Sequence, residues 1–209
     1  MVRKTREEAL KTKENIMDVA KVLFCKKGFD RTNLCDIADE AGVTRGAVYW
    51  HFQNKDELFL ELWKAMCKYD VSYYSLVSTQ KAETGSHLSE MRIWLMSIKE
   101  ILQDEENVVF LRVIGSIMWG KQGSNRIRKL IEDFDKELKG RISLFIKNAI
   151  NCGELSKEVN ASLASNYAFA VMDGYLKMFI DNKSLDLIEY TEMIINSIMT
   201  QLPYFIIKD

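Results

Sequence analysis

The segment 32–55, TNLCDIADEAGVTRGAVYWHFQNK, holds the residues whose types and spacing most clearly suggest a chemistry. Arg45 and Tyr49 are four residues apart, so on a helix they share one face. A guanidinium on such a face can donate two hydrogen bonds to O6 and N7 of guanine in the DNA major groove, worth about 1–3 kcal/mol of base discrimination. Thr44 can bond a phosphate through its hydroxyl and the N–H groups of a helix start. The pattern favours DNA binding over its alternative, a helical hairpin whose Arg–Thr face only meets water.

Further residues of the same segment suit contacts with double-stranded DNA. Gly46 carries no side chain, so the backbone there can approach the duplex closely. Thr32 and Lys55 stand at the expected starts of the two flanking helices, where hydroxyl, ammonium and N–H groups can bind phosphate. Tyr49 and His51 suit contacts with phosphate or with the methyl group of thymine.

The same segment has the residues that a helix-turn-helix needs. Ala38 is small enough to let two helices approach each other closely, and Gly42 permits the turn between them. Ile37, Val43 and Val48 are spaced to pack between the two helices. This arrangement leaves the Arg–Thr face on the outer side of the second helix, which is the face a recognition helix turns toward the major groove.

Residues 18–62 resemble the DNA-binding domain of the TetR family of bacterial transcriptional regulators. The resemblance rests on two runs, AKVLFCKKGFDRTNL and DIADEAGVTRGAVYWHFQNKDELF. A Gly after the first helix, the IAxxAGV turn, the Tyr of the recognition helix and the HF-x-NK-x-x-LF continuation all stand in register. The runs RKTREEAL and VTRGAVYWHF are most similar to the branch that represses multidrug-efflux genes.

The resemblance implies a ligand-responsive repressor of multidrug-efflux genes, although activation in place of repression stays open. In the family, two heads of a homodimer read the half-sites of a palindromic operator, and a bound small molecule moves them apart through the fourth helix.

Arg45 and Gly46 are the positions expected to read bases. The matching positions imply DNA contacts at Thr32, Thr44, Arg45, Gly46, Tyr49, Trp50, His51 and Lys55. Trp50 could instead pack in the core of the head, and the cations Arg3, Lys4 and Arg6 form either an arm on DNA or a solvated tail.

Composition and helical periodicity predict an all-α fold. Only 1 residue of 209 is Pro, and 47% are apolar, so turn-rich β architectures are disfavoured and a sizeable core is available. We expect a helix-turn-helix DNA-binding head over residues 1–55 and a larger helical ligand-binding and dimerisation domain over 56–209. The head carries 11 basic and 8 acidic side chains and the rest 18 and 22, as suits a DNA-binding head on an acidic body.

The larger domain is expected to contain helices over 86–101, 108–119, 125–151, 159–181 and 185–202. Its aromatic and Met side chains suit an apolar pocket for a small hydrophobic or cationic effector, with Asp173 as the acid for a cation. The candidates for ligand binding are Trp63, Met66, Trp94, Phe110, Trp119, Tyr167 and Asp173. The alternative for each aromatic or Met residue is a place in the ordinary core, and for Asp173 a dimer contact or a place facing water.

The last two helices present wide apolar faces suited to a homodimer interface or to burial within one subunit. No spacing of nucleophile and base, phosphate loop or paired-carboxylate motif indicates an enzyme, so we expect no catalytic residues and no cofactor. The 4 cysteines are scattered without a CxxC pair, which argues against a metal site. No apolar run is long enough for a membrane span, and we expect a cytoplasmic protein. A helical ligand-binding or scaffold protein without DNA binding is the alternative function.

Overall fold

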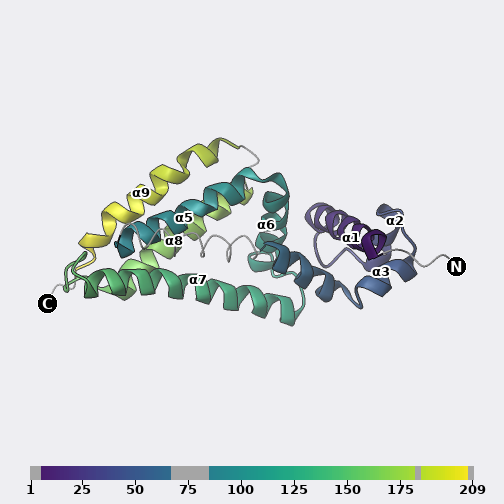
Figure 1. Ribbon diagram of the computed structural model, residues 1–209, viewed down its shortest axis with the longest axis horizontal. Helices are drawn as coiled ribbons and strands as arrows, with labels where there is room; N and C mark the ends of the chain where they lie inside the picture. The colour runs from purple at the N-terminus through teal and green to yellow at the C-terminus, as the bar shows by residue number, and fades with distance from the viewer. Residues whose placement is uncertain (1–5, 67–84, 182–184, 207–209) are drawn as a thin grey trace. The chain divides into compact units, whose positions relative to one another are not determined.

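The computed structural model describes residues 6–66, 85–181 and 185–206 (Figure 1). The all-α prediction is confirmed: within these ranges the chain forms helices, with one isolated antiparallel bridge between Val159 and Ile206. Two compact units can be distinguished, and each is described by itself. Unit 1 comprises Met1–Lys68 with Val109–Ile131, and unit 2 comprises Tyr69–Val108 with Glu132–Asp209.

Unit 1 contains the head, whose helices are α1 (Arg6–Lys27), α2 (Leu34–Glu40) and α3 (Arg45–His51), followed by the helical segment 55–66. Each start and end has a local cause. Gly28, at φ +87°, ends α1 in the left-handed conformation that glycine tolerates, as expected. Asn33 and Asp36 form a reciprocal capping box at the start of α2, and the side chain of Asn54 caps segment 55–66.

The core of the head is aromatic at one end and aliphatic at the other. Phe24, Phe29 and Phe59 are buried and form a chain of rings, with centroids 4.9 Å and 5.5 Å apart. Ile37 and Val48 are fully buried between α2 and α3, which confirms their predicted packing. Val43, expected to pack with them, is only half-buried because it lies in the turn itself.

The helices of unit 2 are α5 (His87–Gln103), α8 (Ala161–Asp181) and α9 (Thr191–Gln201), with the 3-10 turns η1 (Leu185–Tyr190) and η2 (Leu202–Tyr204). Two further helices, α6 (Glu105–Met118) and α7 (Asn125–Asn151), contribute residues to both units. Figure 1 shows α9 beside α5 and α8. Arg92 of α5 ties this packing by bonding Glu192 and Asn196 of α9, at 2.8 Å and 3.1 Å.

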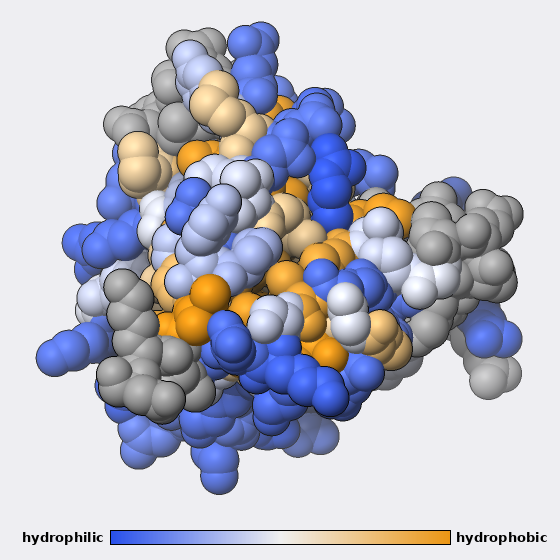
Figure 2. All heavy atoms as spheres, turned by 90° about the vertical axis from the view of Figure 1, so that its left-hand side faces the viewer, coloured by the Kyte–Doolittle hydropathy of each residue, from blue (hydrophilic) through white to orange (hydrophobic). Residues whose placement is uncertain are grey.

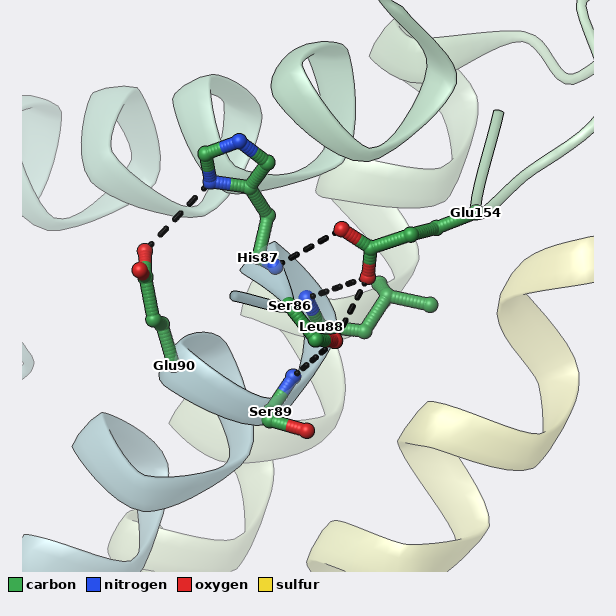
Figure 3. A network of polar contacts seen from close by, with 6 residues as sticks. All are labelled: Ser86, His87, Leu88, Ser89, Glu90 and Glu154. Atoms are coloured by element: carbon green, nitrogen blue, oxygen red, sulfur yellow. Dashed lines mark hydrogen bonds and ion pairs between the residues drawn. The ribbon is translucent and has the colours of Figure 1, made fainter. Parts of the chain in front are cut away.

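A carboxylate from a distant part of the chain determines where α5 begins (Figure 3). Glu154 accepts hydrogen bonds from the Ser86 hydroxyl at 2.7 Å and from the amides of His87 and Leu88 at 2.8 Å and 3.1 Å. Burial acts to raise the pKa of Glu154, but these hydrogen bonds outweigh it and lower the pKa. The Ser86 hydroxyl oxygen also accepts a hydrogen bond from the Ser89 amide and so caps α5, which confirms Ser86 as the predicted start of this helix.

The expected single helix over 185–202 is wrong, because the chain forms η1 before α9 begins at Thr191. Thr191 is fully buried, and its hydroxyl donates to the carbonyl of Ile188 at 2.8 Å. Its oxygen lies 2.5 Å from the hydroxyl of Tyr175 on α8. This buried polar junction anchors the start of α9 against α8, which periodicity along the chain cannot reveal.

No helix in the described ranges combines the length and apolarity needed to cross a bilayer. Apolar side chains nevertheless reach the surface of unit 2 between hydrophilic ones (Figure 2). Met178 on α8 and Met193 on α9 are examples, with exposed fractions of 55% and 61%. Phe179 and Ile198 of the same helices are buried, so the two wide apolar faces divide between the core of unit 2 and its surface.

Candidate nucleic-acid interface

The outer face of α3 carries the polar and aromatic residues expected to meet DNA. Val48 packs inward, whereas Arg45 and Tyr49 are exposed, Tyr49 with 53% of its surface. Trp50 is exposed over 73% of its surface, which excludes the alternative that it packs in the core of the head. A helix of this kind has one face for its own domain and one free for a groove.

Gly46 lies on this exposed face without a structural need for glycine. A Cβ added there would meet only the Thr44 hydroxyl oxygen, at 3.9 Å, and the residue does not have a positive φ. The fold would therefore accept alanine at this position. A glycine that the fold does not require is consistent with room for a closely approaching partner.

Thr44 caps α3 and keeps a donor for a second partner. Its side-chain oxygen accepts a hydrogen bond from the amide of Ala47 at 3.1 Å, so Thr44 is the N-cap of α3. A hydroxyl that accepts one hydrogen bond can still donate its own hydrogen, and Thr44 is exposed. A DNA phosphate, which only accepts, would match that free donor.

The turn that aims α3 is held by a residue that the sequence analysis missed. Gly42 has φ +65°, so its predicted role in the turn is confirmed. The side-chain amide of Asn15 on α1 donates to the carbonyl of Ala41 at 3.0 Å, just before this glycine. Asn15 lies 26 positions away from Ala41 in the sequence, so spacing along the chain carries no signal for the contact.

Thr32 and Lys55 occupy positions inside the head. Thr32 is only 1% exposed, and its hydroxyl donates to the carbonyl of Gly28 at an oxygen–oxygen distance of 2.9 Å. The Lys55 ammonium donates to the carbonyls of Phe29 at 2.5 Å, Thr32 at 2.9 Å and Asp30 at 3.3 Å. Burial lowers the pKa of Lys55 against the attraction of Asp30 and Asp56. This placement speaks against a side-chain phosphate contact for either residue, because their hydrogens are already donated.

His51 ends α3 beside Trp50. The two ring centroids are 4.5 Å apart and the rings are edge to face, which restricts how Trp50 can lie on the surface. His51 is half-buried, so part of its ring remains accessible from solvent. The arm formed by Arg3 and Lys4 lies outside the described residues, and Arg6 is the first residue of α1.

The residues predicted to bind a ligand belong to both units. Unit 1 contains Trp63 and Phe110, which are buried against Phe59 at ring distances of 6.2 Å and 5.3 Å, together with Met66 and Trp119.

Unit 2 contains Trp94, whose ring centroid lies 6.0 Å from that of Phe145. It also contains Tyr167, 4.8 Å from Phe205, and Asp173. Trp63, Trp94 and Phe110 are therefore buried and take part in ring packing, as their core alternative predicts. A pocket role for them stays a prediction.

Asp173 has an acidic neighbour that the sequence analysis missed. Burial, followed by the charge of Asp173, raises the pKa of Asp135 on α7 to about 6. Burial also raises the pKa of Asp173 on α8, against the pull of Lys177. The two acids are 38 positions apart in the sequence, so only the packing of α7 on α8 reveals them as a pair. In the described ranges as a whole, this pair included, no group of three or more His, Cys, Asp or Glu residues could hold a metal ion.

The sequence pattern of the bacterial regulatory proteins of the tetR family matches residues 16–62, which span α2 and α3. The transcriptional regulator AcrR of Shigella flexneri is 32% identical over 190 residues, covering 87% of this chain and 82% of AcrR. The regulator TtgR of Pseudomonas putida is 32% identical over 185 residues, covering 86% and 85%.

The solved structure of MexZ, a repressor of Pseudomonas aeruginosa, superimposes with a TM-score of 0.76 at 23% identity, covering 95% of this chain and 99% of MexZ. This likeness supports the fold, a helix-turn-helix head followed by a larger helical domain. The family match and the two curated relatives confirm the resemblance drawn from residues 18–62. The chain belongs to the TetR family of bacterial regulatory proteins.

Proposed function

We propose that this protein is a ligand-responsive transcriptional repressor that binds a palindromic operator as a homodimer and controls multidrug-efflux genes. The observation that carries the proposal is the exposed surface of α3, where Arg45, Gly46 and Tyr49 are accessible while Val48 is buried. Arg45 and Gly46 are assigned to base reading in the major groove, and Thr44 to a phosphate. Thr32 and Lys55 are assigned to positioning the loop that leads into α2.

The assignment to repression and to efflux genes draws on the relatives. One curated relative, 51% identical over 63 residues, is named a probable repressor of the acrEF/envCD operon in Escherichia coli. MexZ is described as a key repressor responsible for antibiotic resistance. These relatives are named as regulators and not as enzymes, which supports a non-catalytic role in the cytoplasm.

Dimerisation is assigned to the surface of α8 and α9. Leu163, Met178 and Met193 are exposed there, each over at least 50% of its surface. Exposed apolar side chains on neighbouring helices suit a symmetric interface between two copies. Two copies are also what a palindromic operator requires, because each head reads one half-site.

For the effector we propose an apolar or aromatic cation. Asp135 and Asp173 both have raised pKa values in unit 2, so a positive charge brought beside them would be favoured. Aromatic rings and Met side chains of this unit suit the apolar part of such a ligand.

The test is a gel shift of the full-length protein on the DNA upstream of its own gene, at low and at physiological salt. We expect a shift that a shuffled fragment of equal length does not compete away, and release of the DNA by tetraphenylphosphonium, an aromatic cation. Triphenylphosphine oxide, which is similar in shape but uncharged, is the control for the charge. Absence of a shift on any neighbouring DNA, even at low salt, would favour the alternative of a helical ligand-binding or scaffold protein.

A further inference from the structure

The turn between α6 and α7 contacts the head through two carboxylates of unit 1. The amide of Gly123 donates to the carboxylate of Asp30 at 2.8 Å, and the hydroxyl of Ser124 donates to Asp56 at 2.6 Å. Asp30 lies in the loop between α1 and α2, and Asp56 in the first turn of segment 55–66. The loop between α1 and α2 and the segment 55–66 thus each bond one short turn, which is more than 60 residues away in sequence.

The shape of this turn is strongly constrained. Lys121 and Gly123 have positive φ values of 55° and 85°. A Cβ on Gly120 would stand 2.3 Å from the carbonyl oxygen of Ser116, and a Cβ on Gly28 would stand 2.9 Å from the side-chain oxygen of Gln122. Glycines at these positions therefore allow a tight turn and a close approach to the end of α1.

Asp30 joins this turn to the loop that leads into the reading helices. Its carboxylate accepts the Gly123 amide, while its carbonyl and those of Phe29 and Thr32 accept the Lys55 ammonium. Asn33, which follows Thr32, is the N-cap of α2. Thus the α6–α7 turn, Asp30, the Lys55 cluster and the start of α2 form one continuous set of polar contacts.

We propose that Asp30 and Asp56 are positioning residues whose hydrogen bonds hold the α6–α7 turn against the head, a pair of contacts that we call the latch. Binding of DNA at α3 then slows hydrogen exchange at the amide of Gly123. The second half of this inference rests on the proposed function, since it requires a DNA ligand. By linkage, any coupling from DNA to the turn also runs from the turn to DNA. The latch depends on acceptor oxygens and not on negative charge, which distinguishes it from a general electrostatic effect of two acids.

The experiment is hydrogen exchange of the full-length protein, read at peptides that contain Gly123, with and without the DNA upstream of its gene. The variant D30A/D56A removes both acceptors, whereas the matched control D30N/D56N removes both charges and keeps an acceptor oxygen at each position. Without DNA, we expect exchange at Gly123 to become about tenfold faster in D30A/D56A, as for the loss of one hydrogen bond, and to stay near wild type in D30N/D56N. With DNA, we expect exchange at Gly123 to slow in the wild type and in D30N/D56N only.

Equal exchange at Gly123 in D30A/D56A and the wild type would overturn the latch, as would loss of protection in D30N/D56N. DNA-induced slowing that persists in D30A/D56A would overturn the coupling. Should D30A/D56A not fold, as judged by thermal unfolding, the single variants D30A and D30N provide the same comparison. A wild type that binds no DNA defeats the proposed function, while the DNA-free exchange still decides the latch.

Discussion

Two carboxylates, Glu61 in unit 1 and Asp135 in unit 2, lie in opposite electrostatic environments. In unit 1, Glu61 accepts hydrogen bonds from Lys13 and Lys64, each at 2.7 Å, and these bonds lower its pKa to about 2. In unit 2, burial and the charge of Asp173 raise the pKa of Asp135 to about 6. Unit 1 therefore stabilises the charged form of Glu61, whereas unit 2 destabilises the charged form of Asp135. Glu154 of unit 2 differs from Asp135 because hydrogen bonds at the start of α5 lower its pKa.

The contrast between Glu61 and Asp135 matches the functions that we propose for the two units, DNA binding in unit 1 and effector binding in unit 2. Contacts such as Lys13–Glu61, which joins α1 to segment 55–66, hold the head in one shape, and a recognition helix must keep its shape to fit a groove. An acid pair with raised pKa values gains most when a cation arrives, as a site for a positively charged effector requires. Three changes test the comparison, beginning with the largest expected effect.

Arg45→Ala removes the guanidinium that we assign to base reading. We expect the affinity for the operator to fall by about 1–3 kcal/mol, with a much smaller loss on shuffled DNA, because only the operator presents the matching guanine. Fluorescence anisotropy with both DNA fragments at the same salt concentration measures the difference. Arg45→Lys is the matched control: it keeps the positive charge and loses the planar fork, so it should retain non-specific binding and lose discrimination. An equal loss on both fragments would instead make Arg45 a phosphate contact.

Lys55→Met tests whether a cation of unit 1 works inside the head and not on DNA. The ammonium bonds three backbone carbonyls, so we expect the free energy of unfolding to fall by about 1–2 kcal/mol. The salt dependence of DNA binding should keep its slope, because no phosphate contact is lost. Lys27→Met, at the exposed end of α1, is the control for removing one charge from the head. A slope reduced by about one ion with unchanged stability would return Lys55 to the DNA interface.

Lys55 also marks where sequence reasoning reaches its limit. Signals that act over a few residues predict the structure correctly: Gly42 lies in the turn between α2 and α3, Ser86 starts α5, and α7 spans the predicted range 125–151. These signals suffice because capping and helical periodicity depend on neighbours within one or two turns.

What the sequence could not reveal are contacts between distant residues. Glu154 bonds the start of α5 from 68 positions beyond Ser86, and Lys55 reaches carbonyls up to 26 positions back. Nothing in the local pattern distinguishes a lysine that binds phosphate from one that binds carbonyls, because the residue type and the helix position are the same. No sequence motif marks the dimer and ligand surfaces of unit 2, so the sequence indicates them only through apolar helix faces and a supply of aromatic and Met residues.

The smallest expected effect comes from Asp135→Asn in unit 2. The pKa of Asp135 is about 6 in the folded protein against 3.8 for an ordinary Asp, so the folded state holds this proton more tightly than the unfolded chain does. Stability due to this group is therefore present below pH 3.8 and is lost as the pH rises through 6. Because the side chain is only half-buried, solvent screening reduces the effect, and we expect about 1 kcal/mol.

Urea unfolding at pH 5 and pH 7.5 measures this change. The free energy of unfolding of the wild type should fall by that amount at pH 7.5, whereas that of Asp135→Asn should stay the same. Glu158→Gln, an exposed acid of the same unit, is the control. Equal pH dependence in wild type and Asp135→Asn would remove the contrast between the units. If tetraphenylphosphonium at pH 7.5 removes the difference in stability between the wild type and Asp135→Asn, the contrast between the units is strengthened, because a bound cation stabilises the ionised pair.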